Sequence, residues 1–213
     1  MKFVNGDRIV CAGDSITWWY RDDKNILGEG YARILDYILS ITYPEMDLKF
    51  FNTGANGRTS GGLYNGVNDC ILDKKPDWVI MMIGANDLWR KYDSPTILNS
   101  HGNVEDYKKN LFGVIEKTLP HVKGIFLLTP YYLEPNREDP FRKDIDEFCD
   151  VCREAAEKYD VILVDIQKAF DDFMQYRHPT FINWDRVHPG QVGSTLIARE
   201  VLKAAGMDRA LIG

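Results

Sequence analysis

The 213-residue sequence predicts a single α/β domain of the flavodoxin-like type, spanning residues 1–213, with a five-stranded parallel sheet between two helical layers. Strand-like and helix-like segments alternate five times along the chain. The apolar run at residues 78–83 is continuous, as in a strand buried on both faces. The length suits one hydrophobic core and is short for two, and right-handed crossovers favour the strand order 2-1-3-4-5.

The first half of the chain supplies two predicted strands and two predicted helices before the apolar run. Residues 8–12 are a short apolar segment and predict the first strand. Residues 31–41 carry apolar side chains at helical spacing and are followed by Pro44, which ends a helix. Residues 48–52 predict the second strand. A glycine-rich turn follows, and residues 63–73 then predict a second helix.

The second half continues the alternation. Residues 104–118 predict a helix, and residues 124–129 predict a fourth strand that a proline ends. Residues 140–158 place apolar side chains on one stripe of a long helix, and residues 161–166 predict the fifth strand. A last helix is expected at residues 190–204. No repeat, low-complexity tract or linker divides the chain, so we expect one domain.

The net charge and the apolar runs indicate which kinds of partner and which cellular compartment to expect. The net charge of −6 gives no reason to expect nucleic acid or an anionic membrane as a partner. Charged residues interrupt the N-terminus before a signal-peptide core can form, and the longest apolar runs are too short to span a bilayer. We therefore expect a cytoplasmic protein with no membrane partner.

The sequence gives little support for a metal or cofactor. Cys149 and Cys152 form a C-x-x-C pair, but they lie within a helical pattern with no second Cys or His pair nearby. No G-x-G-x-x-G follows the first strand, and the turn at residues 54–59 lacks the P-loop spacing and its lysine. We predict no metal site and no cofactor.

Polar residues and glycines follow the predicted strands where each strand ends. Ser15 follows the first strand, Gly54 and Gly57 the second, Asn86 the third and Tyr131 the fourth. The carboxyl ends of parallel strands meet at one edge of a sheet, and ligands of such folds bind there. The sequence therefore predicts that these residues lie together at one edge of the sheet.

Ser15, Asp185 and His188 have the side chains of a nucleophile, an orienting acid and a base. A serine hydroxyl needs a base to take its proton, and imidazole titrates near neutral pH. An aspartate three residues before the histidine can reach its other ring nitrogen. The Ser15 N–H, the Gly57 N–H and the Asn86 amide are candidate donors for a developing oxyanion.

Four segments resemble, in order, the four conserved blocks of the SGNH (GDSL-type) hydrolase family: Gly13-Asp14-Ser15, Asn52-Thr53-Gly54-Ala55-Asn56-Gly57, Gly84-Ala85-Asn86-Asp87 and Asp185-Arg186-Val187-His188-Pro189. The resemblance implies a flavodoxin-like SGNH fold with Ser15 as nucleophile, His188 as base and Asp185 as acid. It also implies Gly57 and Asn86 as oxyanion donors beside the Ser15 N–H. The resemblance therefore implies that the chain is a carboxylic ester hydrolase.

Within that family the chain looks most like the acetylxylan-esterase branch, on residues 76–90, 123–132 and 184–189. The resemblance implies deacetylation of xylo-oligosaccharides inside bacterial cells, without a metal and by a homo-oligomer. One departure is Ala55-Asn56, which stands where Ile-Ser is common. It touches no catalytic role but alters the lip of the pocket.

The expected substrate is a small acylated carbohydrate. Flat aromatic side chains suit sugar rings, and the candidate substrate contacts beside the site segments are Asp14, Trp89, Tyr131 and Trp184. Packing is the alternative role for each aromatic residue.

Two other functions stay open at this point. A lysophospholipase or thioesterase of the same fold would show a long apolar acyl channel. A non-catalytic SGNH-like binding module is the other, and the intact Ser15, Asp185 and His188 argue against it. The chain has no G-x-S-x-G segment, which disfavours a lipase-type α/β-hydrolase.

Overall fold

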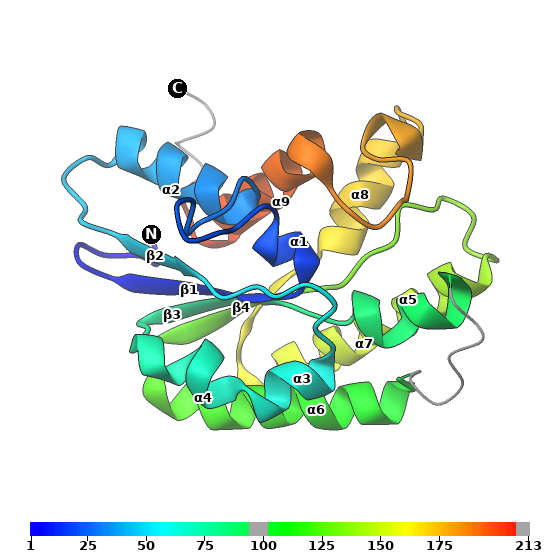
Figure 1. The fold of residues 1–213 in the computed structure, drawn as a ribbon, viewed down its shortest axis with the longest axis horizontal. Helices are drawn as coiled ribbons and strands as arrows, with labels where there is room; N and C mark the ends of the chain where they lie inside the picture. The colour runs from blue at the N-terminus through cyan, green and yellow to red at the C-terminus, as the bar shows by residue number, and fades with distance from the viewer. Residues whose placement is uncertain (94–101, 208–213) are drawn as a thin grey trace.

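The computed structural model describes residues 1–93 and 102–207, and its centre is a parallel sheet in the order β2-β1-β3-β4-β5 (Figure 1). The strands are β1 (Arg8–Gly13), β2 (Lys49–Asn52), β3 (Trp78–Met82), β4 (Gly124–Leu128) and β5 (Ile162–Val164). In register, Val10 of β1 lies between Phe51 of β2 and Val79 of β3. The predicted sheet, its strand order and its α/β class are confirmed.

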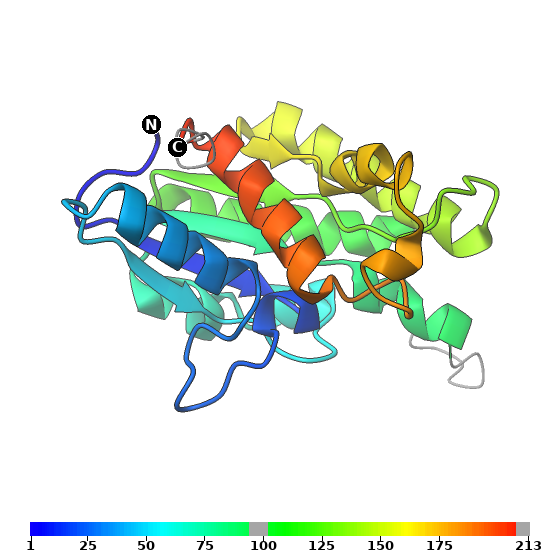
Figure 2. The ribbon, with the colours of Figure 1, turned by 90° about the horizontal axis from the view of Figure 1, so that it is seen from above.

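Helices cover both faces of the sheet (Figures 1 and 2). One face carries α1 (Ser15–Trp18), α2 (Tyr31–Thr42), α8 (Ile166–Met174) and α9 (Gly190–Ala204). The other carries α3 (Ser60–Asn65), α4 (Val67–Cys70), α5 (Ala85–Asp93), α6 (Val104–Thr118) and α7 (Pro140–Tyr159). Short 3₁₀ turns occur at Leu72–Lys74, Leu119–His121 and Pro179–Phe181.

The hydrophobic core lies on both sides of the central strands. All five residues of β3 are buried, as the continuous apolar run predicts for a strand covered on both faces. Between α6 and α7, the rings of Tyr107 and Phe148 stack with centroids 3.9 Å apart. The Tyr107 hydroxyl donates to the Ile83 carbonyl at 3.0 Å, so this buried polar group is satisfied.

The C-x-x-C pair belongs to this core. Cys149 and Cys152 are both buried on α7. The Cys149 thiol donates to the Pro130 carbonyl at 3.2 Å, and the Cys152 sulfur lies 3.3 Å from the Tyr107 hydroxyl. Burial raises the pKa of the Cys152 thiol to about 12, which keeps it protonated and unreactive at neutral pH.

Two sequence-based expectations were wrong in detail. The single helix predicted at residues 63–73 is broken at Gly66, which ends α3, and again at Ile71 before a 3₁₀ turn. The fifth strand predicted at residues 161–166 ends at Val164, because the Asp165 side chain accepts from the Lys168 N–H at 3.0 Å and caps α8. The helices α1, α5 and α8 were not predicted.

None of the helices within residues 1–93 and 102–207 combines the length and the apolar content needed to cross a bilayer. The carboxyl ends of the strands share one edge of the sheet, and β1 ends there at Gly13. This edge is where the predicted site residues converge.

Candidate active site

Ser15 is presented at the N-terminus of a short helix directly after β1. Asp14 is the N-cap of α1, and its Oδ1 accepts from the Ile16 N–H at 2.9 Å. This cap fixes the turn between β1 and α1, so the first helical residue, Ser15, lies at the edge of the sheet. Asp14 itself is 1% exposed.

Ser15, His188 and Asp185 form one hydrogen-bonded chain. The Ser15 Oγ lies 3.0 Å from His188 Nε2, and His188 Nδ1 lies 2.6 Å from Asp185 Oδ2. Asp185 Oδ1 accepts from the N–H groups of Val187 and His188, each at 3.0 Å. The predicted nucleophile, base and acid are therefore in contact, in an arrangement that can move a proton from serine to imidazole.

The Asp185 carboxylate is stabilised in its charged form. Burial raises the pKa of Asp185, but the hydrogen bonds from His188 and from the Val187 N–H outweigh burial and hold that pKa below its usual value. An ionised carboxylate at this position favours the imidazole tautomer that carries its proton on Nδ1. Nε2 is then free to accept the serine proton.

A left-handed residue shapes the loop that carries the acid and the base. Arg186 has a φ of 60°, which costs a non-glycine residue roughly 1–2 kcal/mol. Its carbonyl accepts from the Leu133 N–H at 2.9 Å. The loop is thus tied to the segment that follows β4.

Gly57 and Asn86, two of the predicted oxyanion donors, lie on segments that contact each other. Gly57 has a φ of 71°, a conformation that glycine adopts without a steric penalty. Asn86 is 6% exposed, and its side-chain amide donates to the carbonyl of Arg58, the residue after Gly57, at 3.2 Å. At Gly54 a Cβ would lie 2.3 Å from the Trp18 backbone nitrogen, so this turn packs against α1 only with glycine there.

A comparison with protein families matches residues 9–201 to the one described as "GDSL-like Lipase/Acylhydrolase". The chain belongs to this family. The predictions of an SGNH hydrolase fold and of a carboxylic ester hydrolase are thereby confirmed.

The chain is also similar to an esterase in sequence and to two hydrolases of known structure. An acetylxylan esterase of Geobacillus stearothermophilus is 36% identical in an alignment of 214 positions that covers 98% of each chain. The crystal structure of that organism's Axe2, an acetylxylan esterase, superposes with a TM-score of 0.93 at 36% identity, over 97% of each chain. LAE5, an α/β hydrolase from the metagenome of Lake Arreo, gives a TM-score of 0.94 at 40% identity, over 98% of this chain and 99% of that one.

In this GDSL-family chain, a buried carboxylate that has no predicted role supports the segments that carry Gly57 and Asn86, the predicted oxyanion donors. Asp87, next to Asn86, accepts from the Ser60 N–H at 2.9 Å and from the Ser60 hydroxyl at 2.5 Å. Burial raises the pKa of Asp87, and the two Ser60 hydrogen bonds oppose that rise. These bonds tie the start of α3 to the start of α5 and so hold Gly57 near Asn86.

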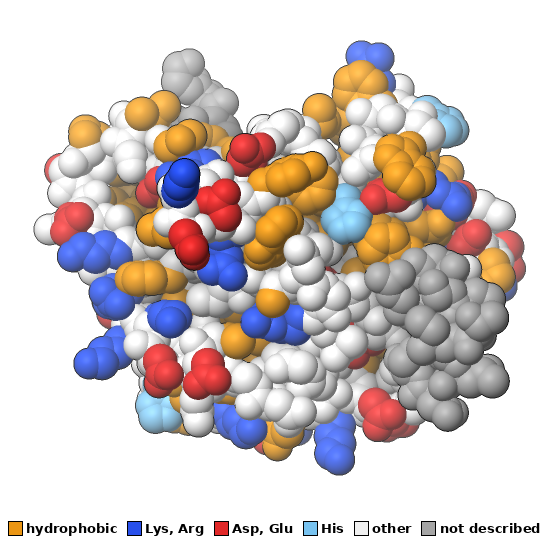
Figure 3. All heavy atoms as spheres, in the orientation of Figure 1, with side chains coloured by type: hydrophobic (Ala, Val, Ile, Leu, Met, Phe, Trp, Pro, Cys, Tyr) orange, Lys and Arg blue, Asp and Glu red, His pale blue; other side chains and the backbone are white. Residues whose placement is uncertain are grey.

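A shallow cleft of about 320 Å³ opens over Ser15 and His188. Its walls are three aromatic and three polar side chains: Trp18, Trp19, Tyr20, Asn56, Asn183 and Asp185. The Trp19 ring lies 5.7 Å from the His188 ring. Figure 3 shows hydrophobic side chains gathered over α1 and the loop before α9, with a histidine among them.

A second hollow, of about 260 Å³, lies on the other side of Asp185. Trp89, Tyr132 and Arg186 are among its lining residues. The Trp89 ring is edge-on to His188 at 5.3 Å.

The four candidate substrate contacts occupy different places. Trp89 contacts His188, and Trp184 is 83% exposed at the rim, next to Asn183 of the cleft. Asp14 and Tyr131 are 1% and 0% exposed, so both lie beneath the cleft floor. Asp14 caps α1, and the Tyr131 ring packs on Phe170 with centroids 4.4 Å apart, so neither side chain lines the cleft.

Among residues 1–93 and 102–207, no three His, Cys, Asp or Glu side chains gather in a way that could hold a metal ion.

Proposed function

We propose that this chain is a serine esterase that removes short acyl groups, above all acetyl, from hydroxyls of xylo-oligosaccharides or related carbohydrates. The observation that carries the proposal is the 3.0 Å contact between Ser15 Oγ and His188 Nε2 in a cleft with aromatic walls. In Axe2, substitutions of a serine, a histidine and an aspartate are described as catalytic mutants, which supports the same roles here.

In the first half of the proposed reaction, His188 takes the Ser15 proton through Nε2 while Ser15 Oγ attacks the acyl carbon. Asp185, 2.6 Å from the other ring nitrogen, stabilises the imidazolium that forms. The carbonyl oxygen becomes an oxyanion, which the Ser15 N–H, the Gly57 N–H and the Asn86 amide stabilise. His188 then gives this proton to the sugar oxygen as the bond between that oxygen and the acyl carbon breaks, so the sugar leaves as an alcohol and the acyl group stays on Ser15.

In the second half, water replaces the sugar. His188 takes a proton from water, and the hydroxide attacks the acyl-enzyme carbon. The same donors stabilise the second oxyanion. Ser15 leaves with the proton that His188 returns, and the carboxylic acid is released.

The cleft favours a sugar as the alcohol half of the ester. Trp18, Trp19 and Tyr20 line it with aromatic rings, which suit sugar rings, while Asn56 and Asn183 supply polar groups that can bind hydroxyls. Axe2 is described as an acetyl-xylooligosaccharide esterase, which supports the acetyl and xylose parts of the proposal. We propose Trp89 and Trp184 as further substrate contacts, because Trp89 contacts the His188 ring and Trp184 is exposed next to Asn183 of the cleft.

An acyl-chain series on 4-nitrophenyl esters tests the acyl half. We expect kcat/KM to be highest for acetate and to fall as the chain lengthens. Rates that climb toward long chains would favour the lysophospholipase or thioesterase function instead. Acetate release from acetylated xylo-oligosaccharides, beside other acetylated cell-wall sugars, tests the alcohol half.

Ser15→Ala tests the mechanism. We expect kcat to fall at least about 10³-fold, because none of the other described residues that line the cleft is a serine, threonine or cysteine that could replace the nucleophile. Hydrolysis at the wild-type rate in this variant would contradict the proposed nucleophile, whereas a wild type without ester hydrolysis would favour the binding-module function. The expected homo-oligomer stays a prediction, which light scattering measures.

A further inference from the structure

Arg186 separates the proposed acid from the proposed base, and the segment after β4 holds it on two sides. Its backbone carbonyl accepts from the Leu133 N–H at 2.9 Å. Its guanidinium forms a hydrogen-bonded ion pair with Glu134 and lies over the Tyr132 ring, 5.0 Å from the centroid. The left-handed backbone of Arg186 is therefore fixed by contacts to three consecutive residues.

That segment is itself anchored to α8. Gln167 accepts from the Tyr132 N–H at 2.8 Å and donates to the Tyr132 carbonyl at 3.3 Å, so one side-chain amide holds both backbone groups. The same Gln167 donates to Asp171 at 2.9 Å. Side-chain amides that satisfy two backbone groups fix a segment in a way that apolar packing does not.

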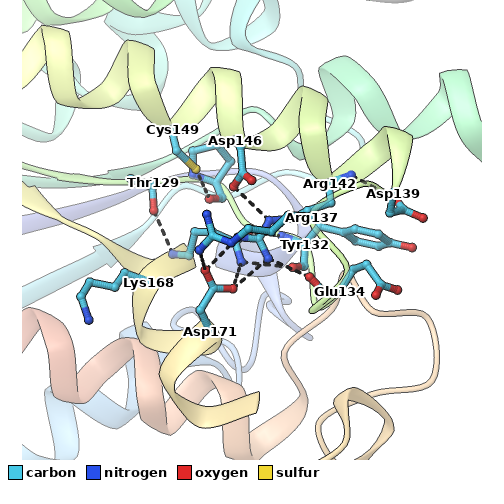
Figure 4. Close-up of polar contacts among 12 residues, drawn as sticks. Thr129, Tyr132, Glu134, Arg137, Asp139, Arg142, Asp146, Cys149, Lys168 and Asp171 are labelled. Carbon is cyan, nitrogen blue, oxygen red and sulfur yellow. Dashed lines mark hydrogen bonds and ion pairs between the residues drawn. The ribbon is translucent and has the colours of Figure 1, made fainter. Parts of the chain in front are cut away.

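Arg142 of α7 completes the anchor. Its side chain is 1% exposed, and it donates to the Glu134 carbonyl at 2.7 Å. It also forms two parallel bonds to Asp171, both at 2.8 Å. Figure 4 shows Asp171 facing the guanidinium groups of Arg142 and Arg137, with Glu134 and Tyr132 beside them.

From this chain of contacts we propose that Glu134 is a positioning residue, which acts through Arg186 to hold Asp185 and His188 in line with Ser15. The inference rests on the proposed roles of those three residues. The Glu134 side chain is 15% exposed and that of Arg186 is 40% exposed. A pair this close to solvent contributes little to global stability, so its effect falls on the local path of the loop.

Glu134 is the residue to change, because Arg186 lines the hollow beside Asp185 and a substitution there would also alter the cleft. Glu134 is not among the described residues that line that hollow or the cleft over Ser15. Glu138 offers a matched control. It lies in the same connection between β4 and α7 and pairs with Lys143 at 2.6 Å, with its side chain 80% exposed.

The experiment compares wild type, Glu134→Ala, Glu134→Gln and Glu138→Ala with 4-nitrophenyl acetate. For Glu134→Ala we expect kcat to fall about tenfold with KM within twofold, because a small displacement of a catalytic group costs up to about 100-fold in rate. Glu134→Gln keeps an oxygen for Arg186 and should retain kcat within about threefold. Glu138→Ala should match wild type.

Proton NMR gives a readout that a purely structural role would not move. The proton between His188 Nδ1 and Asp185 is expected to resonate far downfield in wild type. It should shift or exchange faster in Glu134→Ala while the melting temperature stays within a few degrees. The Glu138→Ala spectrum should be unchanged.

An unchanged kcat and an unchanged downfield signal in Glu134→Ala would overturn the positioning role, as would a loss that appears only in KM. Should the alanine variant fail to fold, Glu134→Gln decides: a loss of kcat beyond threefold with an unchanged downfield signal would overturn it. An inactive wild type, or an active Ser15→Ala, would instead refute the proposed function.

Discussion

Asp14 is a buried carboxylate with a predictable effect on the pH dependence of stability. Burial raises its pKa from the ordinary value of 3.8 to about 7, although the Ile16 N–H and the neighbouring His188 oppose the rise. The folded state therefore binds a proton more tightly at this position than the unfolded state does. Stability from this group is fully present below about pH 4 and is lost as the pH rises through about 7.

The size of the effect follows from the two pKa values. The interval from 3.8 to about 7 corresponds to roughly 4 kcal/mol of unfolding free energy. Between pH 5 and pH 8 the contribution of Asp14 to the free energy of unfolding falls by about 2.5 kcal/mol. Asp14→Asn removes the titrating group and keeps an oxygen that can accept from the Ile16 N–H.

We therefore expect Asp14→Asn to gain about 2.5 kcal/mol over wild type on going from pH 5 to pH 8. Urea unfolding at both pH values, at one fixed protein concentration, measures the difference. Asp139→Asn is the control, because Asp139 also caps a helix, α7, through its side chain but is only partly buried. A wild-type to Asp14→Asn difference that is the same at both pH values would refute the burial argument.

Three further experiments test the site. Asp185→Asn should lower kcat about 10⁴-fold with little change in KM, since an amide favours the wrong imidazole tautomer; steady-state kinetics that show less than a tenfold loss would contradict the acid's role. Asn86→Ala should lower kcat about 10²–10³-fold, and a change confined to KM would remove Asn86 from the oxyanion site. Gly54→Ala should destabilise the fold far more than Gly57→Ala in urea unfolding. Its Cβ would meet the Trp18 backbone, whereas a Cβ at Gly57 meets nothing within 4 Å; equal losses would contradict the packing argument.

The sheet could be predicted from the sequence because each strand is a short apolar run. Such a run can be recognised without knowing which strand it pairs with. The helices that were missed lack that signal in different ways. The four-residue α1 is too short for a period, and α5 is mostly polar around Trp89. In α8 the period was present, since Ile166, Phe170 and Phe173 recur at helical spacing, but Ile166 was counted with the preceding strand.

The site residues that carry chemistry could be predicted because their types and order are distinctive. The residues that hold them could not. Glu134 and Arg186 are 52 positions apart and individually resemble solvated surface charges. Ser60 and Asp87 are 27 positions apart, and neither residue type signals burial. Only the folded arrangement pairs such groups.

Asp14 shows how local geometry changes the role of a residue. In the sequence it stands beside the nucleophile, which suggests contact with substrate. In the structure its side chain turns back to cap α1 and is buried, so its contribution is to the presentation of Ser15. The N-cap role that the Gly-Asp-Ser turn needs thus falls on Asp14, which leaves the Ser15 hydroxyl for His188.

The two hydrogen bonds of the proposed triad depend on different parts of the fold. The bond from His188 to Asp185 spans three residues, and the 185–188 loop with its anchor on the 132–134 segment holds it. The bond from Ser15 to His188 spans 173 residues and joins the end of β1 to the loop before α9. Packing changes beneath α9 should therefore lengthen the serine contact first, whereas loss of the Glu134 pair should disturb the aspartate contact first. The two bonds can be perturbed separately, and the downfield proton reports the bond between His188 and Asp185.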